Sequence, residues 1–210
     1  MQGAVLLGDL INSRRSAASE IDTVLGRLRA AAAELGPITG PAHFTRFRGD
    51  GWQLVTARPE MALRIAVALL ATLAARPSLR TRLVMGLGEI DTLAGGDLGA
   101  ASGSAFLRSG QALDEMSRKR HLAGLGASAP LAPWLEATLH LVEFISDRWS
   151  PPQAEIVAMA VAPGWETQGD LANRLGISRQ AVHSRLSGAG YPALASALAA
   201  FEGQSWSITP

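Results

Sequence analysis

The stretch Thr167–Leu186, Thr-Gln-Gly-Asp-Leu-Ala-Asn-Arg-Leu-Gly-Ile-Ser-Arg-Gln-Ala-Val-His-Ser-Arg-Leu, predicts two short helices joined by a tight turn. Thr167 can cap the first helix, and Asp170 lies three residues later, near the positive end of the helix dipole. Gly176 stands where a left-handed residue would end that helix. Ser178 can cap the second helix, in which apolar residues return at the helical spacing. This order of residues is typical of a helix-turn-helix.

The polar side chains of this stretch are of the kinds that read DNA. Val182 and Leu186 would face inward, and the other faces of the second helix carry no acidic residue. Arg and Gln can each form two hydrogen bonds to a base edge in the major groove, so we expect double-stranded DNA as a partner. A plain helical hairpin with an exposed polar face is the alternative. The candidate DNA-binding residues are Thr167, Gln168, Ser178, Arg179, Gln180, His183, Ser184 and Arg185.

The composition is that of a foldable globular protein. The 210 residues are 48% hydrophobic and 18% charged, with a net charge of +1 and no cysteine. The absence of cysteine excludes disulfides and fits a reducing compartment, so we expect a cytoplasmic protein. The longest apolar stretch, 65–75, is too short to span a bilayer, and we expect no membrane association. The small net charge predicts modest non-specific DNA affinity, so we expect a homodimer to provide a useful specific affinity.

The order of elements predicts two domains and a connecting helix. Residues 1–128 show the order β-α-β-β-α-β followed by α-β, which predicts an α+β domain of the ferredoxin-like class. Residues 129–149 have the apolar spacing of one long linker helix. Residues 150–210 read as an all-α domain that contains the helix-turn-helix. The expected strands are 3–9, 43–48, 52–57, 81–90 and 121–127.

Two motifs of the first domain are expected to converge. Gly8–Ser13 ends the first strand, and Arg46–Gly51 forms a hairpin beside it. Asp9 and Asp50 would then face each other, and two such carboxylates repel unless a cation neutralises them. Mg²⁺ would do so and would in turn hold phosphates. The alternative fits the spacing equally well: Asp9 caps the following helical segment, and Asp50 only shapes an Asp-Gly turn.

These motifs resemble those of known proteins. Gly-Asp-Leu-Ile-Asn-Ser-Arg, residues 8–14, resembles the opening motif of class III nucleotidyl cyclases and of the SatD family. Residues 47–53 resemble the second metal-carboxylate hairpin of both, and residues 83–89 resemble the cyclase strand that follows. The cyclase resemblance covers residues 3–126. The SatD resemblance covers the whole chain, including a C-terminal helix-turn-helix.

The resemblance implies a nucleotide site. Asp9, Asp50 and the backbone carbonyl of Leu10 would hold Mg²⁺, and Arg46 and Asp97 would stand at the base-reading positions. The implied nucleotide-binding residues are Arg46, Asp97, Arg108, Asn12 and Ser13.

One departure concerns catalysis. The catalytic Asn and Arg of cyclases would fall near Gly103 and Leu107, and Arg108 is one position off, about 100° around a helix. Loss of such a charge-stabilising donor costs about 100-fold or more in rate. We therefore expect a domain that binds a nucleotide or pairs two chains, with no catalytic residues.

The sequence thus favours a DNA-binding transcriptional regulator whose cyclase-like domain dimerises and senses a nucleotide. An active nucleotidyl cyclase that makes a cyclic nucleotide from ATP or GTP is the alternative. A third interpretation is a helix-turn-helix that contacts other proteins, which would show no salt-dependent binding to DNA.

Overall fold

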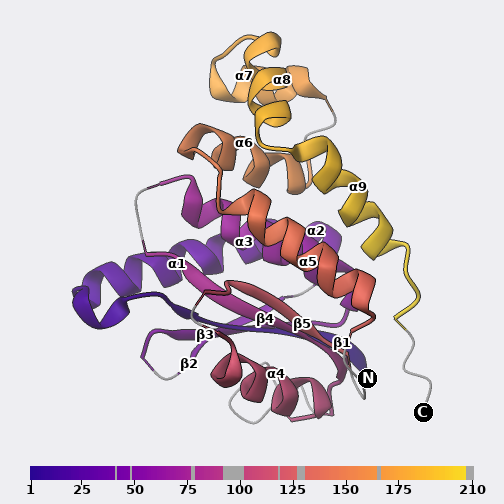
Figure 1. Cartoon of the computed structure of the whole chain (residues 1–210). Coiled ribbons are helices and arrows are strands. Elements are labelled where there is room, and N and C mark those ends of the chain that lie inside the picture. Colours follow the sequence, from indigo (N-terminus) through magenta and orange to yellow (C-terminus); the bar gives the residue numbers. More distant parts are fainter. Residues whose placement is uncertain are drawn as a thin grey trace.

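A computed structural model describes residues 1–40, 42–47, 49–76, 79–91, 102–117, 119–126, 131–164 and 167–206 of the chain. The fold is mixed α+β, with one five-stranded sheet, helices on both of its faces, and a group of C-terminal helices beyond one face (Figure 1). Within the described ranges, no helix is both long and apolar enough to cross a membrane. Asp97, one of the predicted base-reading residues, lies outside these ranges.

The sheet has the strand order β2-β3-β1-β4-β5. β1 pairs antiparallel with both β3 and β4, β2 pairs antiparallel with β3, and β5 runs parallel to β4. Each strand that the sequence predicts is present, and β5 is shorter than expected. The strands are β1 (Gln2–Leu10), β2 (His43–Phe47), β3 (Gly51–Thr56), β4 (Thr81–Glu89) and β5 (Leu122–Leu125).

The helices fall at the positions where the sequence has helical periodicity. There are also two short 3-10 turns: η1 (Ser13–Arg15) follows β1, and η2 (Pro59–Met61) directly precedes α3. The helices are α1 (Ala18–Glu34), α2 (Gly36–Thr39), α3 (Ala62–Ala74), α4 (Ser104–Glu115), α5 (Pro133–Ser146), α6 (Pro151–Val161), α7 (Gln168–Leu175), α8 (Arg179–Gly188) and α9 (Tyr191–Glu202).

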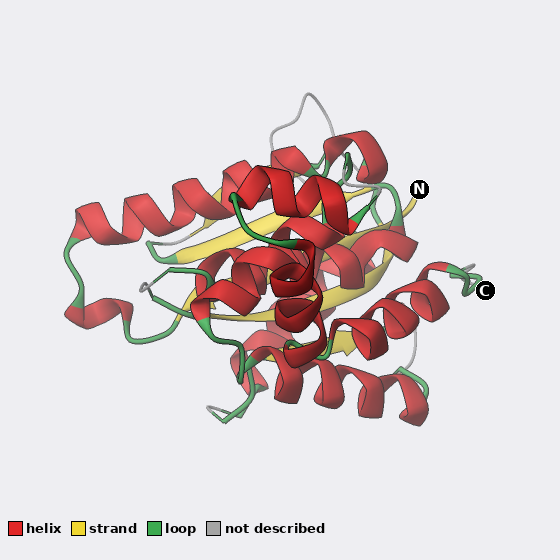
Figure 2. Cartoon of the chain, turned by 90° about the horizontal axis from the view of Figure 1, so that it is seen from above, coloured by secondary structure: helices red, strands yellow, loops and turns green. Residues whose placement is uncertain are grey.

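The two faces of the sheet are covered by different helices. Side chains alternate between the faces along each strand. Ala4 and Leu6 of β1 therefore belong to the large core under α1 and α3, whereas Leu7 packs with Leu113 of α4 on the other side. Figure 1 shows α4 alone below the sheet and α1, α3 and α5 above it. In the view from above, the helices of the upper face and the C-terminal helices lie over the sheet (Figure 2).

Helix α5, expected as a linker, is part of the sheet core. Leu135, Leu139 and Val142 are at most 2% exposed and lie in the same cluster as the strands. A Cβ on Gly124 of β5 would meet the Leu139 side chain at 2.8 Å, so this glycine lets α5 lie close to the strand. Helix α5 is therefore packed on the sheet and does not act as a free linker.

Helix α6 is buried on two sides. Ala154, Val157 and Val161 are fully buried in the large core with the sheet helices. Ile156, also fully buried, belongs instead to a second core that α6 forms with α7 and α8. The helix thus joins the sheet body to the α7–α8 pair by packing on both of them.

Helix α9 returns to the sheet body and fastens the C-terminal helices to it. Arg64 of α3 donates from Nε to Oε1 of Glu202 at 2.6 Å and from Nη1 to the carbonyl of Val161 at 3.2 Å. Tyr191, at the start of α9, donates its hydroxyl to the carbonyl of Ala160 in α6 at 2.9 Å. Burial raises the pKa of the Tyr191 phenol; the charge of Arg64 opposes this rise and that of Glu202 adds to it.

We expect this phenol to make stability fall in alkali. Because its pKa is higher in the folded protein than the ordinary value of about 10, its contribution is complete below pH 10 and is lost as the pH rises through the folded pKa. Tyr191→Phe should cost about 1 kcal/mol at neutral pH through the lost hydrogen bond, and this difference should shrink in alkali. Urea unfolding at a series of pH values measures both effects. Tyr191 is the only tyrosine of the chain, so phenolate absorbance reports its ionisation directly, and a titration that matches the urea-unfolded chain would contradict the prediction.

Candidate functional site

Helices α7 and α8 meet at the turn and caps that the sequence predicts. The amide of Thr167 donates to Oδ2 of Asp170 at 3.0 Å, and the amide of Asp170 donates to Oγ1 of Thr167 at 3.2 Å. Gly176 ends α7 with a φ of 64°, where a side chain would be strained. Ser178 then accepts the amide of Ala181 at 3.1 Å and starts α8. The reciprocal cap therefore fixes the start of α7, the left-handed Gly176 fixes its end, and Ser178 fixes the start of α8.

The α7–α8 pair has a small apolar core of its own. Leu171 and Ala172 of α7 meet Val182 and Leu186 of α8, with Ile156 of α6 closing the cluster. Each of these side chains is at most 6% exposed. The inward positions of α8 are the ones that the i, i+4 spacing predicts.

The opposite face of α8 is open and polar. Gln180, His183 and Ser184 are exposed, and Nε2 of His183 lies 3.5 Å from Oγ of Ser187, one turn later on the same face. Ser187 was not among the predicted residues, although its spacing from His183 would have indicated it. Thr167, Gln168 and Ser178 are also exposed, at the starts of the two helices.

The two predicted arginines of α8 lie at the flanks of this face. The guanidinium of Arg179 lies over Gly169 of α7, where an added Cβ would be 3.0 Å from Nη2. Arg185 is half-buried and turned toward α6, with Nη1 3.8 Å from Oε2 of Glu155. The structure therefore groups Gln180, His183 and Ser184 on the outward face and separates Arg185 from them.

In the sheet, the end of β1 and the hairpin turn converge as predicted. Asp9 lies opposite Gly51 in the register of β1 and β3. Ser13, in the turn after β1, donates its hydroxyl to Oδ2 of Asp50. Asn12, between these positions, has a left-handed φ of 62°, which Asn tolerates better than most residues. The two motifs thus form one local site.

The glycine of the first motif has a packing role. Gly8 lies opposite Trp52 of β3, and an added Cβ would stand 2.5 Å from the indole ring. The indole Nε1 donates to Oγ1 of Thr81 at 2.9 Å, and this hydroxyl donates to the carbonyl of Asp9 at 2.7 Å. Gly8 is therefore needed for the fully buried Trp52, and this arrangement fixes the backbone at Asp9.

The cation at this site is an arginine that the sequence analysis missed. Arg82 of β4 donates from Nε to Oδ1 of Asp9 at 2.7 Å and from Nη2 to Oδ2 at 2.8 Å. Its Nη1 donates to the carbonyl of Met116, just after α4, at 3.3 Å. The hydrogen bonds that Arg82 donates to Asp9 are the main cause of its raised pKa. Partial burial opposes this rise, and the negative charges of Asp9, Asp114 and Asp50 add to it.

This geometry does not fit a Mg²⁺ ion at Asp9. Both carboxylate oxygens already accept a hydrogen bond from Arg82, so a metal would have to displace the guanidinium. Among the residues described, no three His, Asp or Glu side chains group as a metal site would require.

Arg46, another implied nucleotide-binding residue, is not brought to Asp9. Arg46 lies opposite Trp52, on the α1 face of the sheet, and donates to Asp22 of α1 at 2.7 Å. The prediction that Arg46 joins Asp9 in one site is therefore wrong. Side chains alternate between the two faces of a sheet, and Asp9 is on the α4 face. Arg108 of α4 is half-buried and does not line the groove described next.

A groove of about 400 Å³ lies on the α4 face, along the strand that leads to Asp9. Its walls are mostly apolar, and two of its large apolar side chains are open to solvent: Phe47 is 41% exposed and Leu107 is 68% exposed. The groove is lined by Val5, Leu7, Phe47, Gln53, Ser102, Gly103, Phe106, Leu107, Ser109 and Gly110. Leu107 and Gly110 of α4 face it, and Arg108, one step further around the helix, does not.

No protein-family model matches this chain, and no curated protein matches it in sequence.

We predict that Arg82 neutralises the carboxylates around it. Arg82→Met should lower the free energy of unfolding by about 1–3 kcal/mol, because Asp9 loses its partner while half-buried. Mn²⁺ should restore part of this loss, because a cation can take the place of the guanidinium beside Asp9. Urea unfolding with and without Mn²⁺ measures these effects.

The matched control for Arg82→Met is Arg80→Met. Arg80 lies two residues earlier and pairs with Asp147, but its side chain is 52% exposed. We expect that variant to lose less than about 1 kcal/mol. Equal effects of the two substitutions, with no response to Mn²⁺, would show that Arg82 has no special neutralising role.

Proposed function

We propose that this protein is a DNA-binding transcriptional regulator in which α7 and α8 form a helix-turn-helix and α8 is the recognition helix. The main support is the outward face of α8, where Gln180, His183 and Ser184 are exposed together on a helix held by a buried apolar face. Side chains on such a helix can reach base edges in the major groove.

The surroundings of α8 support the same proposal. The turn 176–178 is short and capped on both sides, which gives α8 a fixed start. Thr167 and Gln168 are exposed at the start of α7, where their polar side chains can contact a phosphate. Arg179, beside Gly169, has a positive charge at the same end of the pair. We assign these three residues to the DNA backbone and the α8 face to the bases.

The sheet body is proposed to pair two copies of the chain and to bind a nucleotide. The element order β-α-β-β-α-β, with antiparallel neighbours β2-β3-β1-β4, supports a ferredoxin-like core and the resemblance to the SatD and cyclase families. The exposed Phe47 and Leu107 give the α4 face an apolar surface suited to a second copy. A dimer would duplicate the α8 face, which compensates for a net charge of only +1. The cysteine-free composition supports a cytoplasmic location.

The DNA proposal predicts a specific effect of Gln180. After recovery of genomic fragments that bind the purified protein, Gln180→Ala should weaken the preferred site by about 1–3 kcal/mol and leave non-specific binding unchanged. Gln204→Ala, at the far end of α9, is the control and should bind as the wild type does. Fluorescence anisotropy at several salt concentrations measures both. If no DNA is bound in a salt-dependent way, the α7–α8 pair serves protein contacts instead.

The nucleotide proposal is tested by calorimetry with ATP and GTP. We expect Asp50→Asn to change nucleotide binding, because Asp50 holds Ser13 at the end of the β1 motif. Asp22→Asn, on the other face of the sheet, should leave binding unchanged. Identical titrations for wild type and Asp50→Asn would make Asp50 a turn residue only. The cyclase alternative requires a cyclic product when the protein is incubated with either nucleotide and Mn²⁺; the placement of Arg46 and Arg108 gives it no support.

A further inference from the structure

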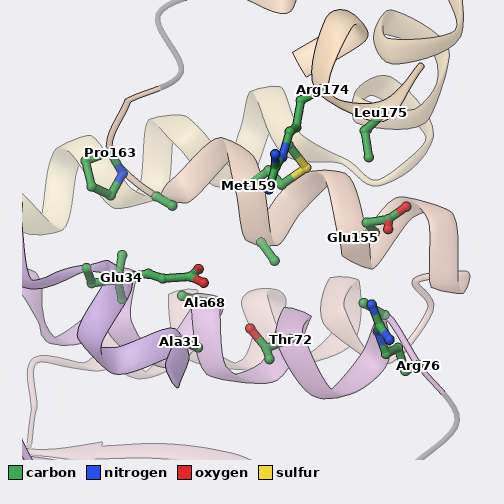
Figure 3. Close-up of a pocket in the computed structure, with 14 residues that line it drawn as sticks. Ala31, Glu34, Ala68, Thr72, Arg76, Glu155, Met159, Pro163, Arg174 and Leu175 are labelled. Carbon is green, nitrogen blue, oxygen red and sulfur yellow. The ribbon is translucent and has the colours of Figure 1, made fainter. Parts of the chain in front are cut away.

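A second hollow lies at the junction between the sheet body and the C-terminal helices. It has a volume of about 570 Å³, within the range of about 300–1,000 Å³ typical of small-molecule sites. Its walls come from α1 and α3 on one side and from α6 and α7 on the other (Figure 3). None of the residues assigned to DNA or to the nucleotide lines it.

The floor of the hollow is apolar and made of small side chains. Ala31 and Ala68 are buried beneath it, Ala158 faces them from α6, and Met159 and Leu175 cover the side toward α7. Larger side chains at the alanine positions would close the space. The hollow therefore exists because three neighbouring helices have alanine where they face one another.

The rim has one charged side chain from each of four segments. Glu34 ends α1, Arg76 follows the end of α3, Glu155 is on α6 and Arg174 is on α7. Glu155 lies near Arg185, whereas the other three form no ion pair with the described part of the chain. Figure 3 shows Glu34 and Arg76 toward opposite sides of the hollow, with Arg174 reaching down from α7 between them.

We infer that this hollow binds a small zwitterionic molecule with an apolar body. Its cationic group would meet Glu34, and its anionic group would meet Arg174 and Arg76. An apolar middle would lie on the alanine floor, where it removes apolar surface from water. Two acidic and two basic side chains around one site favour a ligand with both charges over a simple anion or cation.

The position of the hollow gives such a ligand a regulatory role, and this part rests on the proposed DNA-binding function. The ligand touches α1 and α3 of the sheet body and α7 of the DNA-reading pair at the same time. Because α8 is positioned by α7, any difference in ligand affinity between two placements of α7 becomes a difference in DNA affinity.

The binding step is tested without DNA, by saturation-transfer NMR on the full chain with four probes of equal length. These are ε-aminocaproate, caproate, hexylamine and hexanol. We expect ε-aminocaproate to bind best. Glu34→Gln and Arg174→Gln, both at exposed positions, should each weaken it about fivefold, the effect of one lost charge contact. Glu20→Gln, on α1 outside the hollow, should not.

A blocked variant completes the test. Thr72→Trp places a large side chain in the hollow and should abolish the ε-aminocaproate signal, whereas Thr23→Trp, on the exposed part of α1, should retain it. Equal signals from the four probes, or a signal unchanged by the Glu34 and Arg174 substitutions, would overturn the proposal. These charge variants decide the matter even if Thr72→Trp does not fold. Preferential ε-aminocaproate binding in a protein that binds no DNA would leave the site standing and remove only its regulatory role.

Discussion

The two-sided burial of α6 is the constraint on which the arrangement of this protein depends. Ala154 and Val157 on one side are part of the large core that the sheet and its helices form, and Ile156 on another side is part of the core of α7 and α8. A closely packed interior does not deform continuously. The α7–α8 pair can therefore change its orientation only if α6 moves within the large core or if the contact with Ile156 is remade.

This constraint bears on how a signal would pass through the molecule. A DNA-reading unit on a loose tether would be insensitive to the state of the sheet body. Here α5 is packed on the sheet, and α6 belongs to both apolar cores. Helix α9 is joined to α3 by the ion pair between Glu202 and Arg64. A ligand bound to the sheet body, or in the hollow beside α6, would therefore act on elements that are continuous with α8, the proposed recognition helix. Such coupling is limited by the difference in ligand affinity between the two arrangements.

The negative charge of Asp9 at the end of β1 is balanced by a side chain, whereas the motifs predict a metal ion there. A pair of carboxylates beside a glycine-rich turn is the pattern of a magnesium site, yet the positive charge nearest to Asp9 is the guanidinium of Arg82. That guanidinium also reaches the end of α4, so the ion pair joins β1, β4 and α4. The charge of Asp9 is thus neutralised by Arg82 of the same chain. This arrangement suits a binding or structural role better than metal-assisted phosphoryl chemistry.

The sequence by itself determined the features that depend on neighbours along the chain. The caps at Thr167 and Ser178, the left-handed Gly176 and the helical and strand periodicities are short-range signals, and the structure has each of them. Tertiary structure alone decided the rest. Arg82 is 73 residues from Asp9 in sequence, so only the register of β1 and β4 brings them together. The face on which Arg46 lies follows from pairing with Trp52, and the turning of Arg185 toward Glu155 follows from the packing of α6. Strand register and helix packing are set by many distant contacts at once, and no local pattern of residues specifies them.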